Sequence, residues 1–80
     1  MLKLFDKLDR YLVEKEYKVT ISNGKVHIIN YLEIKDFSST RVVVRYDGGY
    51  TILLGSDLVV SKMLDDELLI TGKLKSIEYN

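Results

Sequence analysis

The stretch RVVVRYDGGYTILL, residues 41–54, decides the fold. Residues 41–46 place two arginines on one face of an extended chain, and two valines and a tyrosine on the other. Asp47-Gly48-Gly49 follows, a combination typical of a tight turn, and residues 50–54 alternate again on the way back. The stretch therefore predicts a β-hairpin.

The same period of two continues on both sides of this hairpin. Before it, residues 17–21 and 25–37 are separated by Asn23-Gly24, a pair that suits a two-residue turn with positive φ at both positions. After it, Gly55-Ser56-Asp57 is predicted to turn the chain, and a lone glycine within residues 68–79 indicates a bulge or a close backbone approach. The predicted turn or bulge residues are Asn23, Gly24, Asp47, Gly48, Gly49, Gly55 and Gly72.

The predicted connections between strands are all short, at two to five residues. Because a parallel crossover needs about a dozen residues or more, consecutive strands are expected to pair antiparallel. The sequence thus predicts a mainly β fold, an antiparallel meander of six to seven strands. Apolar residues on both strand faces, as at Leu53 and Leu54, favour a sheet that curls into a small roll, barrel or sandwich, or that pairs with a second copy.

Only the N-terminal segment has a helical period. Phe5, Leu8 and Leu12 recur at spacings of three and four, which predicts an amphipathic helix over residues 1–16. With the meander over residues 17–80, this gives a single domain over residues 1–80. Such a short helix needs something to pack on, either an open face or end of the sheet or, as an interaction helix, a partner or a membrane surface. Its polar face carries both signs of charge, which disfavours an anionic membrane.

The composition of the 80 residues excludes several classes of protein. The chain has no cysteine, which removes disulfides, thiol nucleophiles and zinc ribbons. Lys plus Arg and Asp plus Glu are each 12, so the basic excess typical of nucleic-acid binders is missing. No apolar run approaches the roughly 20 residues of a membrane span, and the N-terminus does not resemble a signal peptide. A cytoplasmic protein is expected.

No residue pattern predicts chemistry. His27 is the single histidine and has no nucleophile or second ligand at a useful spacing, and Asp65-Asp66-Glu67 lacks the spacing of a calcium loop. Neither a Walker pattern nor a dinucleotide fingerprint is present. We therefore expect no catalytic, cofactor-binding or metal-binding residues and no enzymatic activity. A small-molecule barrel would require a well-formed pocket with a perturbed acid.

An exposed strand edge or the helix stripe of Phe5, Leu8 and Leu12 is the expected interaction surface. The strand face that carries Arg41 and Arg45 is a further candidate. Arginines with exposed tyrosines can also bind nucleobases, and a short helix before bent strands is typical of Sm-like ring proteins. A small-barrel nucleic-acid-binding protein is therefore the alternative interpretation, although the zero net charge disfavours nucleic acid as a partner.

Four segments of the chain resemble the YabP/YqfC family of sporulation proteins of endospore-forming Firmicutes. One is VHIINYLEIKDF, residues 26–37; another is the valine run before the hairpin turn at residues 42–49. The third is LGSDLVV, residues 54–60. The last is LITGKLKSIEY, residues 69–79, where the family ends on Ile-x-Gly-x-Ile-x-x-Ile-x-Tyr.

The resemblance implies a role in endospore formation, expression in the mother-cell compartment and no known enzymatic activity. It also implies a protein partner, for which a sporulation-specific membrane protein is a candidate, and it is compatible with a homo-oligomer. The family supplies no catalytic residues; Gly55, Leu58 and Gly72 match its pattern and are expected to serve backbone geometry.

Overall fold

The computed structural model describes residues 16–80, which form six strands. Residues 1–15, which carry most of the predicted helix with its stripe of Phe5, Leu8 and Leu12, lie outside the described residues. The strands are β1 (Lys18–Ser22), β2 (Lys25–Ile29), β3 (Glu33–Phe37), β4 (Arg41–Tyr46), β5 (Gly49–Met63) and β6 (Glu67–Tyr79).

The described part of the chain is mainly β, and all of its strand pairs are antiparallel, as predicted. The two-residue turn at Asn23-Gly24 joins β1 to β2, but only the glycine has a positive φ, of 69°. The expectation of positive φ at both central residues is therefore wrong. Asp47-Gly48 likewise turns the chain between β4 and β5.

The prediction of a simple meander is wrong at one connection. The strands lie in the order β1-β2-β6-β5-β4-β3, so β2 pairs with β6 and not with β3. Asn30 turns the chain with a φ of 63°, and its amide donates to the carbonyl of Asp66, the residue directly before β6. Two residues later the amide of Leu32 donates to the carbonyl of Arg45 in β4. This short connection thus passes between two parts of the sheet instead of closing a hairpin.

The prediction of a turn at Gly55-Ser56-Asp57 is also wrong. β5 runs through these residues without ending, and β6 likewise runs through Gly72. The register between the two strands shifts between Leu54 and Gly55 and again between Ser56 and Val59. A strand can bend sharply at such bulges without losing its partner.

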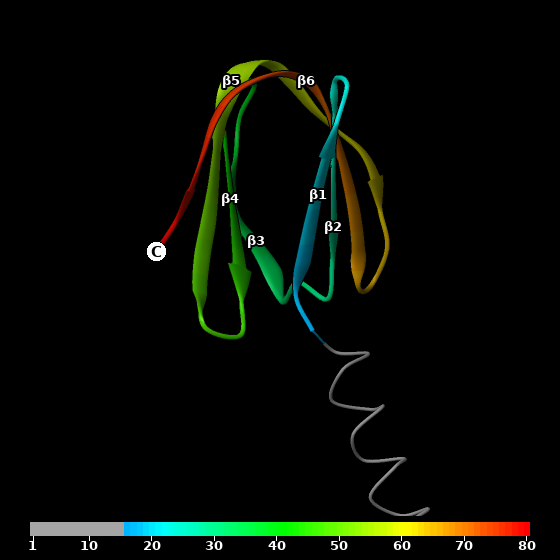
Figure 1. Ribbon diagram of the computed structural model, residues 1–80, viewed down its shortest axis with the longest axis vertical. Coiled ribbons are helices and arrows are strands. Elements are labelled where there is room, and N and C mark those ends of the chain that lie inside the picture. The colour runs from blue at the N-terminus through cyan, green and yellow to red at the C-terminus, as the bar shows by residue number, and fades with distance from the viewer. Residues whose placement is uncertain (1–15) are drawn as a thin grey trace, which may run out of the picture.

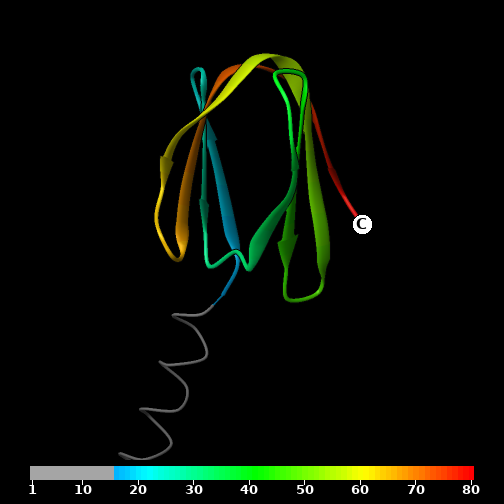
Figure 2. The same ribbon diagram turned by 180° about the vertical axis from the view of Figure 1, so that it is seen from behind.

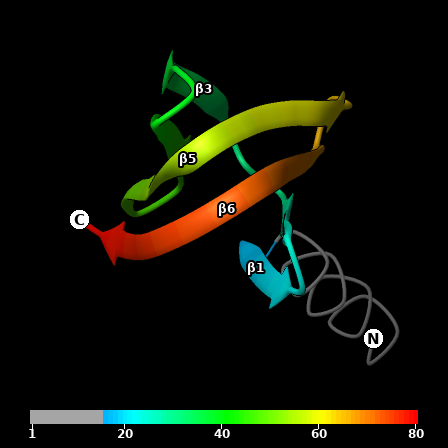
Figure 3. The same ribbon diagram turned by 90° about the horizontal axis from the view of Figure 1, so that it is seen from above.

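The bend doubles the sheet over on itself. One half, here called the β1 half, holds β1 and β2 with the beginning of β6 and the end of β5; the β3 half holds β3 and β4 with the other ends of the two long strands (Figure 1). The halves face each other, and the connection from β2 to β3 crosses between them at the end away from the bend (Figure 2). The sheet is open, with β1 and β3 on opposite sides of the β5–β6 pair, so no closed barrel forms (Figure 3).

The core lies between the two halves. Every second residue of a strand points to the same face, and the inner faces of both halves carry valine, isoleucine and leucine. The buried cluster draws on both halves and consists of Val26, Ile28, Tyr31, Val42, Val44, Leu53, Leu58, Leu68 and Ile70. Bending one sheet therefore gives the chain a two-layer core without a second sheet.

Two glycines allow the long strands to approach at the bend. A Cβ atom on Gly55 would lie 2.0 Å from the carbonyl oxygen of Lys73, and one on Gly72 would lie 2.4 Å from the carbonyl oxygen of Asp57. The φ of Gly72 is also positive, at 130°. Both contacts are with backbone, which cannot move aside as a flexible side chain would.

Tyr17 joins the two halves away from the bend. Its ring stacks on that of Tyr46 at the end of β4, with centroids 4.1 Å apart and an interplanar angle of 7°. Its hydroxyl donates to Oγ1 of Thr51 at 2.7 Å, and Thr51 is the fully buried polar residue among residues 16–80. Burial raises the pKa of Tyr17. The hydrogen bond from Tyr17 gives the buried hydroxyl of Thr51 a partner inside the apolar core.

Substituting the bend glycines should destabilise the fold. Gly55→Ala and Gly72→Ala should each lower the free energy of unfolding by about 2 kcal/mol or more, because the new methyl group meets backbone. Gly24→Ala is the matched control: a Cβ there has space, and only the positive φ opposes it, at about 1 kcal/mol. Urea titrations measure the three values, and a Gly55→Ala variant as stable as the wild type would contradict the account.

Removing the hydroxyl of Tyr17 should reveal the coupling to Thr51. Tyr17→Phe should cost about 1–2 kcal/mol, because a buried threonine hydroxyl loses its donor. In the Tyr17→Phe/Thr51→Val double variant both polar groups are gone, so its cost should be well below the sum of the two single costs. Additive costs in the same denaturation assay would refute the coupling.

Candidate interaction surface

Three ionisable side chains of the β1 half lie close together at the surface, with the carboxylate of Glu67 between His27 and Lys62. Nε2 of His27 in β2 lies 2.5 Å from Oε2 of Glu67 in β6, and Nζ of Lys62 lies 3.8 Å from the other carboxylate oxygen. The hydrogen bond from His27, followed by the charge of Lys62, lowers the pKa of Glu67. Within residues 16–80 no three His, Cys, Asp or Glu side chains gather as a metal site.

Arg41 and Arg45, predicted as an interaction strip, lie on β4 and are each paired with a carboxylate from β3. Nη1 of Arg41 is 3.2 Å from Oδ2 of Asp36, and Nε of Arg45 is 2.8 Å from Oε1 of Glu33. The hydrogen bond from Arg45, followed by the charge of Lys35, lowers the pKa of Glu33. The two guanidinium groups therefore stabilise the outer strand beside them, and their charge is already balanced.

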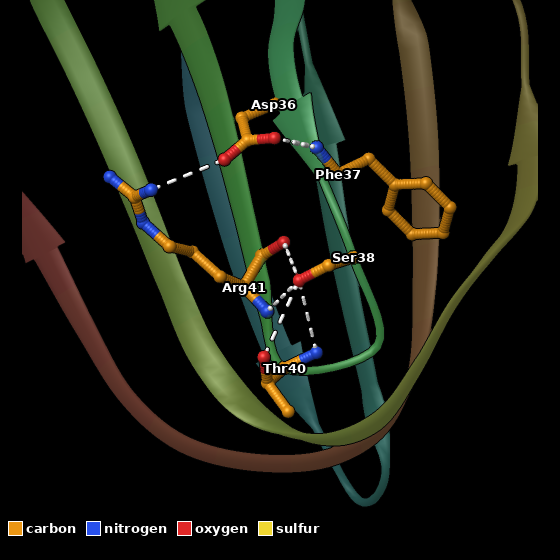
Figure 4. A network of polar contacts seen from close by, with 5 residues as sticks. All are labelled: Asp36, Phe37, Ser38, Thr40 and Arg41. Atoms are coloured by element: carbon orange, nitrogen blue, oxygen red, sulfur yellow. Dashed lines mark hydrogen bonds and ion pairs between the residues drawn. The ribbon is translucent and has the colours of Figure 1, made fainter.

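The β3 edge has several features that discourage pairing with another strand. Its register against β4 shifts between Ile34 and Asp36, which leaves Lys35 in a bulge. The carboxylate of Asp36 accepts from the amide of Phe37 and from Arg41, while the phenylalanine ring points away from this network (Figure 4). Bulges and charged side chains are the usual protection of an edge strand.

The loop that follows β3 is also held by its own hydrogen bonds. Oγ of Ser38 accepts from the amides of Thr40 and Arg41, at 3.3 and 3.1 Å (Figure 4). The loop carbonyls in turn accept from the bend of β5, since the amide of Gly55 donates to Thr40 and that of Leu58 donates to Ser39. The loop thereby covers the edge of β5 beyond Leu54, which pairs with Arg41, the first residue of β4.

The β1 edge lacks these features. All five residues of β1 pair with β2 without a register shift, and β1 contains no acidic residue and no proline. Its one charge is Lys18 at the first position, and the side chain of Ile21 is 54 % exposed. Ile21 borders an open pocket of about 420 Å³, whose apolar wall includes Leu58 and Leu74. β1 is therefore the less protected of the two outer strands.

Other exposed apolar side chains are spread over several elements. Val59 and Met63 lie in the last part of β5, which β4 does not cover, and Leu64 follows in the next loop. Leu32 lies directly before β3, and Phe37 is the last residue of β3. No helix among residues 16–80 has the length and apolar character needed to cross a membrane.

The predicted turn and bulge residues fall at three kinds of position. Asn23, Gly24, Asp47 and Gly48 lie in the two-residue turns. Gly49 begins β5, where a Cβ would clash with the carbonyl of Asn80, and Gly55 and Gly72 are at the bend. Sequence reasoning missed Tyr17 and Thr51 because they are 34 residues apart and neither has a local signal of the contact. It also did not identify β1 as an outer strand.

Acid should weaken the fold through Glu33 and Glu67. Both carboxyl groups have a lowered pKa in the folded state, so their stabilising effect is present above the ordinary value of 4.5 and is lost as the pH falls below it. The drop in urea midpoint between about pH 6 and pH 3 should therefore be smaller for Glu33→Gln/Glu67→Gln than for the wild type.

Glu78→Gln is the matched control for this measurement, because Glu78 has no ion pair within the described part of the chain. It should leave the pH dependence close to that of the wild type. An unchanged acid drop in the double variant would contradict the role given to the two ion pairs.

The comparisons with known proteins identify the family. A search of curated proteins and a search of solved structures each gave no match. The model of the YabP family matches residues 13–80, which include all six strands, the bend glycines and both two-residue turns. A match over this much of the chain shows that the protein belongs to the YabP family.

Proposed function

We propose that this protein is a non-enzymatic interaction module of endospore formation, acting in the cytoplasm of the mother cell. Membership of the YabP family, which suggests a sporulation-related role, is the observation that carries the proposal. The partner is a protein of the sporulation apparatus, with sporulation-specific membrane proteins as the first candidates. The domain contributes a sheet whose less protected outer strand, β1, offers backbone groups for pairing.

The distribution of polar groups supports a binding role over a catalytic one. The cluster between the halves is apolar, and its polar neighbour Thr51 is satisfied by Tyr17. The carboxylates with lowered pKa are half-exposed and lie in ion pairs between neighbouring strands. A general acid or base works best with a pKa near the operating pH, and these pKa values move away from it.

The alternative of a small-barrel nucleic-acid-binding protein has less support. Arg41 and Arg45 are each paired with a carboxylate, which offsets the charge that would attract phosphate. The net charge of zero also provides no general attraction for a polyanion. Binding to single-stranded RNA that weakens steeply with salt would favour this alternative.

Deleting the gene in an endospore-forming host tests the proposed function. The deletion should lower the yield of heat-resistant spores and leave vegetative growth unchanged, because the protein acts only during spore development. A plasmid copy of the wild type should restore the yield. A plasmid copy with Glu78→Gln, a substitution at a residue without an ion pair in the described part of the chain, should restore the spore yield as fully as the wild type does. Normal sporulation in the deletion strain would overturn the proposal.

A further inference from the structure

We propose that β1 pairs antiparallel with β1 of a second copy of this chain. The pairing joins the two doubled-over sheets edge to edge into one continuous sheet. The inference rests on the proposed interaction role and names the partner of that surface. It follows from which backbone groups of β1 face outward, and from which side chains then lie opposite one another.

The direction of the backbone groups follows from β2. The amide of Gly72 donates to the carbonyl of Gly24, and the amide of Asn30 donates to the carbonyl of Asp66, so even-numbered residues around β2 face β6. Backbone groups of successive residues in a strand point to opposite sides. The odd-numbered residues of β2 therefore face β1, where they lie opposite Lys18, Thr20 and Ser22. Val19 and Ile21 are left with their amides and carbonyls directed outward.

One register uses both outward residues in both copies. With Thr20 opposite Thr20 of the second copy, Val19 lies opposite the second Ile21, and Ile21 lies opposite the second Val19. Both of these pairs are hydrogen-bonded pairs in the antiparallel pattern. A slip by two residues leaves one outward residue of each copy opposite a position beyond the end of the strand.

The side chains agree with this register. Val19 and Ile21 share the inner face, where Val19 packs against the core and Ile21 is 54 % exposed. The second copy would cover Ile21 with an apolar neighbour, a favourable cross-strand pair. Lys18 would lie opposite Ser22, and no like charges meet.

The β3 edge provides the contrast within the same molecule. A strand added there would meet the bulge at Lys35 and the paired carboxylates of Glu33 and Asp36. The remaining uncovered stretches of β5 and β6 contain Lys62, Lys73 and Lys75. Edges that are bulged or charged resist pairing, so β1 is the edge at which a second copy is expected.

Disulfide trapping tests the register directly, because the wild-type chain has no cysteine. In the proposed pair, Thr20 and its counterpart form a non-hydrogen-bonded pair with Cα atoms about 4.5 Å apart, within the range of a disulfide. Thr20→Cys should therefore form a covalent dimer under mild oxidation. Ser22→Cys, on the same edge and face, would lie opposite Lys18 and should form no covalent dimer, and neither should Lys35→Cys on β3.

Charge substitution tests the same contact without a covalent bond. Thr20 is exposed, so Thr20→Lys and Thr20→Glu should both fold, as circular dichroism can verify. Each variant alone would place like charges at the two-fold axis, so its mass in solution should be that of the 9.3 kDa monomer, while the wild type has twice that mass. Mixing the two variants should restore a dimer.

A wild type that stays monomeric at high concentration, together with a Thr20→Cys variant that cross-links no faster than Ser22→Cys, would overturn the self-pairing. This result is distinct from failure of the proposed function. A monomeric protein whose deletion still lowers the spore yield would retain its role in endospore formation and would bind a different partner.

Discussion

The close approach of β5 and β6 at Gly55 and Gly72 is the constraint on which the rest of the structure depends. Each glycine faces a backbone carbonyl of the other strand at a distance that leaves no room for a side chain. Because both long strands pass through this point without ending, the two halves of the sheet are joined by continuous hydrogen-bonded strands. The bend places the inner faces of the halves against each other, so a short chain obtains a two-layer core from one sheet.

The doubled-over sheet also determines what the surface offers. A closed barrel has no outer strands, but this sheet ends at β1 and β3. The two ends differ: β3 carries a bulge and paired charges, and β1 carries an uninterrupted run with one terminal lysine. The protein therefore has one protected edge and one less protected edge, which is the physical basis of the interaction role proposed above.

Local signals made much of the fold predictable. The alternation in RVVVRY, the Asp47-Gly48 turn and the Asn23-Gly24 turn each depend on neighbouring residues, and the strands beside them were correctly predicted. Gly55 was interpreted as part of a turn because a glycine followed by serine and aspartate has the same local signal in a turn and in a bent strand. Whether such a site ends a strand depends on the opposing strand, here on the carbonyl of Lys73, which is 18 residues away.

The interaction surface was less predictable for the same reason. Strand order depends on contacts such as that of β2 with β6, and no local pattern identifies β1 as an outer strand.

NOE spectroscopy tests the doubled-over sheet most directly. The doubled-over sheet should give close α protons for His27 and Leu69, which oppose each other in β2 and β6, and ring contacts between Tyr17 and Tyr46. Contacts of His27 with β3 in place of Leu69, and none between the two tyrosine rings, would contradict it.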